Sequence, residues 1–253
     1  MTRTGRQNLV LGFLLAPVTL YLGVFFLGPL LIIAVFSILT PGLYGGVEWA
    51  FYHWNYGRIF GWADGFIEIF EPVYLQILWR SLSFAALTVI LTLILCFPVA
   101  FWVSRLSDRW RLVFLFLITL PFFLPPILTA MAWGMLGNPT AGVINLAWKW
   151  LSGSDQPLVN VYSLGGVVWH MMQYSTAFLF LFIVEAFRTM DPALEEAGRD
   201  LYGSAFQVFT RITLPLLMPG IIAAALLSFA LSFDDFIITR FNNGGVETFP
   251  VFV

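Results

Sequence analysis

Residues 81 to 103 read SLSFAALTVILTLILCFPVAFWV and contain no charged side chain. An α-helix needs about 20 consecutive apolar residues to cross the roughly 30 Å hydrocarbon core of a bilayer, so this stretch is long enough to span one. Its apolar residues are continuous and do not alternate with polar ones, which is the pattern of a membrane helix and not of a barrel strand. The segment therefore predicts a transmembrane helix.

Further uncharged stretches of similar length predict an all-α integral membrane protein, a bundle of five transmembrane helices. The expected helices cover residues 9–39, 81–103, 112–136, 164–184 and 212–233. The composition agrees, because 60% of the 253 residues are hydrophobic and only 10% are charged, whereas soluble domains carry about 25% charged residues. The first stretch exceeds the roughly 7 to 15 apolar residues of a signal peptide, so we expect it to be retained as a helix.

The charges in the loops predict the orientation of the bundle, because cytoplasmic loops carry an excess of Lys and Arg. With a cytoplasmic N-terminus, eight basic residues lie inside and four lie outside. The inner ones are Arg3, Arg6, Arg105, Arg109, Arg111, Arg188, Arg199 and Arg211, and the outer ones are Arg58, Arg80, Lys149 and Arg240. We therefore expect the N-terminus in the cytoplasm. The cluster of Arg105, Arg109 and Arg111 is interpreted first as a topology signal and second as a contact with lipid headgroups.

Prolines interrupt the third expected helix. Pro121, Pro125 and Pro126 each lack a backbone N–H, so this cluster predicts a break near the start of the helix or a sharp bend. Bent helices around a cavity suit a transport path, but prolines are frequent in membrane helices generally, and both interpretations stay open.

The loop of residues 185–215 has the sequence features of two short helices joined by a turn. Asp191-Pro192 predicts a helix start, with the Asp191 carboxylate as N-cap and proline at the first helical position. Gly203 is expected to end this helix, and Ser204-Ala-Phe-Gln207 has the spacing of a capping box that opens a second one. We therefore expect two capped helices at the inner face.

Part of this loop resembles a known motif. Glu196-Ala197-Gly198 with Ile212, Leu214 and Pro215 resembles the EAA motif, E-A-A, three residues, G, nine residues, I-x-L-P, of the permease subunits of binding-protein-dependent ABC importers. Gly198 stands at the second alanine, and Tyr202 stands where the glycine is expected, with Gly203 one place later. The resemblance implies a type I ABC importer permease fold, one permease domain over residues 1–253, and an EAA coupling loop at about 185–215.

Softer matches resemble the spermidine/putrescine-type permeases of the bacterial inner membrane. They are Gly46 to Trp49, Tyr74-Leu75, Arg80 to Leu82, Phe97 to Ala100, Leu120 to Phe122, and Leu231 to Phe236. This resemblance implies the import of polyamines by alternating access, with another small solute as the alternative. Such permeases usually have a sixth helix, so an incomplete chain is expected.

The resemblance also implies partners and roles. The partners are cytoplasmic ATP-binding subunits, an identical or different second permease, a periplasmic substrate-binding protein and the lipid bilayer. The ATPase-coupling residues are Glu196, Ala197, Gly198, Tyr202, Gly203, Leu214 and Pro215. Glu196 is then the polar anchor, the small residues after it allow close approach, and Tyr202 or Gly203 forms the turn. The chain has no G-x-x-x-x-G-K-[ST] run, so we expect the ATP to be bound by a partner.

Two carboxylates follow the last expected helix directly. Asp234 and Asp235 lie near membrane depth, where a charged group is costly and suggests function. Facing a cavity, they could pair with the ammonium groups of a polyamine, while Phe233 and Phe236 offer ring faces for cation–π contact. Alternatively, the aspartates only mark the interfacial end of the helix, and both interpretations stay open.

Other classes of function find less support. A secondary transporter needs charged groups inside its helices, and the five expected spans contain none. The motifs G-x-S-x-G and H-E-x-x-H are absent from the sequence, so we expect no enzyme. Cys96 is the single cysteine, and His53 and His170 are far apart, which predicts no metal site, no cofactor and a satisfied polar role for His170. A net charge of −2 offers no basic surface for nucleic acid.

Overall fold

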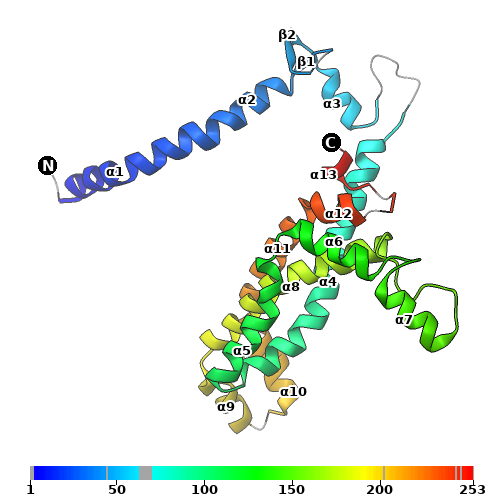
Figure 1. Cartoon of the computed structure of the whole chain (residues 1–253). Helices are drawn as coiled ribbons and strands as arrows, with labels where there is room; N and C mark the ends of the chain where they lie inside the picture. Colours follow the sequence, from blue (N-terminus) through cyan, green and yellow to red (C-terminus); the bar gives the residue numbers. More distant parts are fainter. Residues whose placement is uncertain are drawn as a thin grey trace. The chain divides into compact units, whose positions relative to one another are not determined.

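The computed structural model describes residues 3–43, 45–62, 70–201, 203–242, 244–245 and 247–252. Tyr202, one of the predicted coupling residues, lies outside the described residues. The chain divides into two compact units, residues 1–75 and 76–253, and each is described here by itself. Figure 1 follows the elements from α1 in blue to α13 in red.

The first unit begins with a long apolar helical run. Helix α1 (Arg3–Leu22) continues through a π-helical turn, η1 (Gly23–Leu27), into α2 (Gly28–Phe36). Residues Leu11–Phe36 are long and apolar enough to cross a membrane, and their side chains are exposed or only partly buried. This run corresponds to the first expected helix.

A small hairpin follows, which the sequence analysis did not predict. Strands β1 (Leu39–Pro41) and β2 (Val47–Phe51) pair antiparallel, with Thr40 opposite Glu48. Helix α3 (Trp54–Ile59) holds the base of the hairpin, because Asn55 Nδ2 donates to the carbonyl oxygens of Ser37 and Leu39 at 3.0 and 2.8 Å. The strands lie outside the membrane-crossing run Leu11–Phe36, which is helical as predicted. The expected end at residue 39 was too late, because Leu39 belongs to β1.

The second unit is a helical bundle. Its long apolar helices are α4 (Val73–Ser104), α8 (Leu164–Thr189) and the run of α10 (Ala205–Val208), η3 (Phe209–Thr213) and α11 (Leu214–Phe233). Its remaining helices are α5 (Asp108–Thr119), η2 (Leu120–Phe123), α6 (Pro126–Leu136), α7 (Val143–Ser152), α9 (Pro192–Asp200), α12 (Ile237–Asn242) and α13 (Phe249–Phe252). In the described chain, four helices can span a membrane, and a fifth span forms if the bent pair α5–α6 counts as one.

The proline cluster bends the third expected helix, as predicted. The helical run Asp108–Phe123 meets α6 at 92°. Leu124 and Pro125 have extended backbones, with ψ of 137° and 132°, because each precedes a proline that disfavours the helical conformation. The bend lies in the middle of the segment and not near its start.

Most of the five predicted helix starts were too late, and α4 and α5 show why. Helix α4 begins at Val73, before Ser81, and α5 begins at Asp108, before Leu112. The expected limits were placed at charged residues, but a charge ends an apolar run without ending a helix. Arg80 and Arg109 therefore lie inside helices that continue beyond the apolar stretch.

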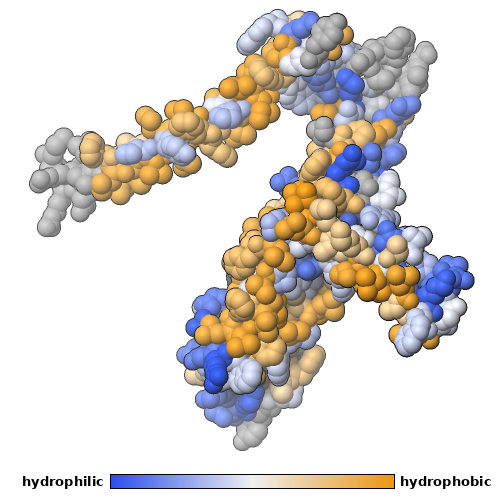
Figure 2. Space-filling model, viewed as in Figure 1, coloured by the Kyte–Doolittle hydropathy of each residue, from blue (hydrophilic) through white to orange (hydrophobic). Residues whose placement is uncertain are grey.

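Helix α8 lies at the centre of the bundle and packs against α4, α5 and α11 (Figure 1). The core consists of Ala100, Val103, Leu179, Phe180, Ile183, Val184, Phe187, Leu217, Ile221 and Ala224. Small residues let the backbones approach, since a Cβ at Gly220 of α11 would lie 2.9 Å from the Ala186 Cβ of α8. Figure 2 shows an apolar surface along these helices and hydrophilic residues around α9, consistent with lipid on the sides and water at the end.

Candidate functional site

The two helices of the 185–215 loop begin at the predicted caps. The Asp191 carboxylate accepts from the Ala193 N–H at 3.0 Å, which starts α9. At the start of α10, Ser204 Oγ accepts from the Gln207 N–H at 3.3 Å, and the Ser204 N–H donates to Gln207 Oε1 at 2.9 Å. Both caps are confirmed, and each satisfies backbone donors that a helix start leaves open.

Gly203 lies three residues beyond Asp200, the last residue of α9, and closes the turn that follows the helix. Its N–H donates to the Gly198 carbonyl at 3.2 Å, so it satisfies one of the free carbonyls at the end of the helix. A Cβ at residue 203 would lie 2.7 Å from that carbonyl oxygen. The turn therefore requires glycine at this position.

Gly198 is buried against the second half of the loop. A Cβ there would lie 2.5 Å from Ile212 Cδ1 and 3.3 Å from Val208 Cγ2. The small residue thus serves packing inside the loop, while its predicted role in the approach of a partner stays a prediction. Leu214, whose side chain is partly buried on the core, and Pro215 begin α11 directly after the π-helical turn η3.

These contacts predict different effects for two matched substitutions. Gly203→Ala brings a methyl group onto a backbone oxygen that cannot move alone, so we expect the loop to lose about 1 to 3 kcal/mol of stability. Gly198→Ala meets side chains and no backbone atom, most closely the flexible end of Ile212 and then Val208 at 3.3 Å. Alanine also favours a helix by about 1 kcal/mol over glycine, so we expect a smaller loss. Limited proteolysis of the loop in purified permease measures both, and equal cleavage rates for the two variants would contradict this account.

Glu196 and Ala197 lie on the exposed side of α9. Large apolar side chains lie near them in the sequence, since Leu201 is 82% exposed and Phe206 is 75% exposed. Exposed apolar side chains bordered by charged groups are typical of a protein docking surface. Glu196 was predicted from the sequence to face a partner, but the two apolar side chains were not.

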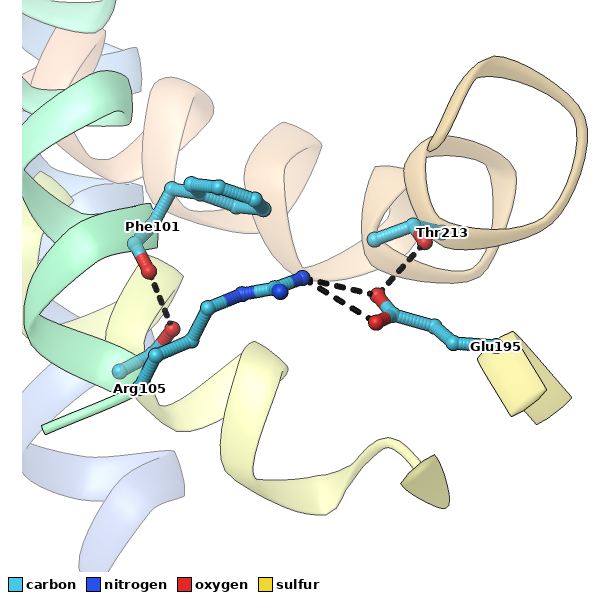
Figure 3. Close-up of polar contacts among 5 residues, drawn as sticks. Phe101, Arg105, Glu195 and Thr213 are labelled. Atoms are coloured by element: carbon cyan, nitrogen blue, oxygen red, sulfur yellow. Dashed lines mark hydrogen bonds and ion pairs between the residues drawn. The ribbon is translucent and has the colours of Figure 1, made fainter. Parts of the chain in front are cut away.

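Glu195, the neighbour of Glu196, faces the bundle. Its Oε1 accepts from Thr213 Oγ1 at 2.8 Å, and its two carboxylate oxygens accept from Arg105 Nη2 at 3.1 and 3.2 Å (Figure 3). The Glu195 side chain is 15% exposed and the Arg105 side chain is 47% exposed. This cluster was not predicted, because Arg105 was interpreted as a topology signal and a lipid-headgroup contact and not as a partner of Glu195.

Aromatic rings support the guanidinium of Arg105. Its Cζ lies 4.2 Å from the centroid of the Phe101 ring, which is cation–π geometry. Phe101 in turn packs edge-on against Phe187 of α8 and Phe209 of η3, with centroids 5.5 and 5.9 Å away. The charged cluster therefore rests on an aromatic contact among α4, α8 and η3.

Asp234 and Asp235 lie at the other end of α11. Both line a cavity of about 260 Å³, together with Tyr174, Ser232 and Phe236. Phe233 instead stacks on Phe229 at 6.4 Å and is outside the described lining of this cavity. The structure thus brings three of the four predicted path residues together.

The two aspartates differ in their surroundings. Asp235 accepts from the N–H groups of Ile238 and Thr239 at 3.3 and 2.9 Å and from Thr239 Oγ1 at 3.1 Å, so it caps α12. Burial raises the pKa of Asp235, although these hydrogen bonds oppose the shift. Asp234 is exposed. Its carboxylate is therefore the more accessible of the two.

His170 is a satisfied polar residue of the bundle, as expected. Its Nδ1 is 3.0 Å from Asn242 Nδ2, and its Nε2 is 3.1 Å from Thr129 Oγ1. These bonds join α8 to α12 and α6. Among the described residues, no group of three or more His, Cys, Asp or Glu side chains is placed to hold a metal ion.

Comparison with known proteins identifies the family. Residues 97–250 match the family described as "Binding-protein-dependent transport system inner membrane component". The spermidine/putrescine transport system permease protein PotB of Haemophilus influenzae is 32% identical over 167 residues, which are 65% of this chain and 57% of that protein. The putrescine transport system permease protein PotI of Escherichia coli is 34% identical over 141 residues, which are 55% of this chain and 46% of that protein. The matched part of the chain thus spans about half the length of these relatives.

A solved structure shares the fold. A chain in the crystal structure of a bacterial ABC transporter involved in the import of the acidic polysaccharide alginate superposes with a TM-score of 0.68 at 14% identity, covering 95% of this chain and 82% of that one. The architecture is therefore that of a type I ABC importer permease, a multi-pass transport component and not an enzyme. The chain belongs to the family of binding-protein-dependent transport system inner membrane components.

Proposed function

We propose that this chain is the permease subunit of an ATP-driven importer that moves polyamines across the inner membrane by alternating access. Residues 1–253 act as one permease domain with a cytoplasmic N-terminus. The observation that carries the proposal is the cavity at the end of α11, where an accessible carboxylate, Asp234, lies beside a second one and an aromatic ring. The names of the relatives PotB and PotI, spermidine/putrescine and putrescine permeases, agree with a cationic solute.

The proposed partners bind at the two ends of the bundle. ATP-binding subunits dock on the exposed side of α9, with Glu196 as the polar anchor and Leu201 and Phe206 as apolar contacts. A periplasmic substrate-binding protein delivers the solute at the opposite end, and a second permease, identical or different, completes the pathway. Closure of the ATPase then rocks the helices and exposes the cavity to one side at a time.

The two carboxylates at the cavity have separate roles in this proposal. Asp235 uses its oxygens to cap α12 and so holds the cavity wall in place. Asp234 keeps its charge available for the ammonium group of a polyamine, and the Phe236 ring, which is 50% exposed, offers a cation–π contact. Phe233 contributes indirectly, through its stacking on Phe229 at the end of α11.

Reconstitution in proteoliposomes tests the function as a whole. We expect uphill accumulation of radiolabelled spermidine only when the ATPase subunits, the binding protein and ATP are all present, because the permease itself supplies no energy. Vesicles that carry a proton or sodium gradient but contain no ATP serve as the control. Accumulation driven by the gradient alone would show a secondary transporter and would overturn the proposal.

A further inference from the structure

The ion pair between Arg105 and Glu195 joins parts of the chain that lie 90 residues apart in the sequence. Helices α8 and α11 are continuous with the 185–215 loop, whereas α4 ends at Ser104 and leads into α5. Arg105 is the residue directly after α4. Its side chain therefore gives α4 a direct contact with α9 that the path of the chain does not provide.

We infer that Arg105, Glu195 and Thr213 form a positioning cluster that carries the movement of α9 to α4, so that the ATPase drives a third helix beside α8 and α11. The inference rests on the proposed docking of an ATPase subunit on α9. Glu196 on the exposed side of α9 meets the partner. Glu195, which is bonded to Arg105 on the inner side (Figure 3), passes the displacement on.

The carboxylate of Glu195 is held from two directions. Arg105 Nη2 lies 3.1 and 3.2 Å from its two oxygens, and Thr213, a residue only 1% exposed, donates to Oε1 at 2.8 Å. Water competes little for these oxygens, because the Glu195 side chain is 15% exposed. Charge-assisted hydrogen bonds with both oxygens engaged restrict the orientation of the carboxylate as well as its position. The contact is thus suited to transmitting a displacement.

The guanidinium of Arg105 is also held in place by an aromatic contact. It lies over the Phe101 ring, which packs on Phe187 at the end of α8 and on Phe209 at the start of η3. Because the Arg105 side chain is packed in this way, a displacement of Glu195 moves the end of α4 and not only the Arg105 side chain.

Thr213 connects the cluster to an irregular turn of the helix. It is the last residue of η3, a π-helical turn, and such turns interrupt regular helix bonding and recur at functional sites. Pro215 follows, which removes a further backbone donor from this region. By bonding Thr213 to α9, Glu195 makes α9 and the start of α11 move together and prevents the π-helical turn from flexing instead.

The test measures spermidine imported per ATP hydrolysed by the assembled complex of permease, ATPase and binding protein in proteoliposomes. We expect Arg105→Ala and Glu195→Gln each to lower this ratio about tenfold, within the range for residues that carry coupling. ATP hydrolysis and subunit assembly are expected to stay unchanged. Glu195→Gln keeps the shape of the side chain, so it remains informative if Arg105→Ala does not fold.

Two further variants separate positioning from a general structural effect. Arg188→Ala breaks an ion pair of the same length, 3.1 Å to Glu185, but within α8 and with side chains 51% and 60% exposed, so we expect no change in the ratio. Arg105→Lys keeps the charge without the planar fork and should recover part of the ratio. If the cluster only stabilised the fold, the spermidine imported per ATP would not fall in Arg105→Ala, recover in part in Arg105→Lys and stay unchanged in Arg188→Ala while ATP hydrolysis remains constant.

The outcomes distinguish this inference from the docking proposal. An unchanged ratio in Arg105→Ala, an equal fall in Arg188→Ala, or release of the ATPase by Arg105→Ala would each overturn the positioning cluster. Glu196→Ala in the same assay tests docking on its own. If Glu196→Ala stops uptake while Arg105→Ala leaves the ratio unchanged, only the positioning role fails; if Glu196→Ala leaves uptake and assembly unchanged, the docking proposal fails.

Discussion

Glu196→Ala is expected to reduce solute uptake about 30-fold or more while the permease still inserts in the membrane. The side chain is exposed on α9 and is the proposed polar anchor for the ATPase. Truncation of a hot-spot residue at an interface costs about 2 kcal/mol or more, which is about 30-fold in affinity, and the polar anchor is expected to be such a residue. Because the side chain is exposed, folding should not change, and ATP hydrolysis should continue without transport.

Co-purification and uptake together measure this effect. Glu185→Ala is the matched control, since it removes an exposed carboxylate from α8, outside the proposed docking surface. We expect the control to retain both ATPase binding and uptake. Normal uptake by Glu196→Ala would remove this residue from the contact, and the ATPase would then have to bind elsewhere on the permease.

Asp234→Asn is expected to lower spermidine uptake about tenfold at low substrate concentration. The substitution keeps the shape of the side chain but removes its charge, and a hydrogen bond to a charged group contributes about 1.5 to 3 kcal/mol. Asp235→Asn should have a weaker effect, because Asn is also a good N-cap and can still hold the start of α12. The apparent KM for spermidine should therefore rise more in the first variant than in the second.

Radiolabelled uptake over a range of spermidine concentrations distinguishes these cases. Asp155→Asn, which changes an exposed carboxylate paired with Lys149 at 2.5 Å after α7, serves as the control. Equal losses in Asp234→Asn and Asp235→Asn would contradict the separate roles proposed for the two residues. An unchanged KM in Asp234→Asn would leave the aspartates as markers of the interfacial end of α11.

The local features of the chain were predictable from neighbouring residues. The bend between α5 and α6 follows from Pro121, Pro125 and Pro126, each of which acts on its own turn of the backbone. The caps at Asp191 and Ser204 depend on residues two or three positions away. The hairpin β1–β2 was not predicted, because its strands are only three and five residues long and lack the long apolar pattern of a membrane helix.

The sequence by itself determined that this protein crosses a membrane in helices, where the third helix bends and where the 185–215 loop begins its two helices, because each feature depends on residues close together in the chain. Only the tertiary structure decided that Glu195 faces Arg105 while Glu196 faces outward, and that Asp234 rather than Asp235 keeps an accessible carboxylate. Successive residues on a helix point about 100° apart. Two adjacent identical side chains therefore face different surroundings, and the packing around the helix decides which of them is buried. That packing joins residues as far as 90 positions apart, and no local pattern records it.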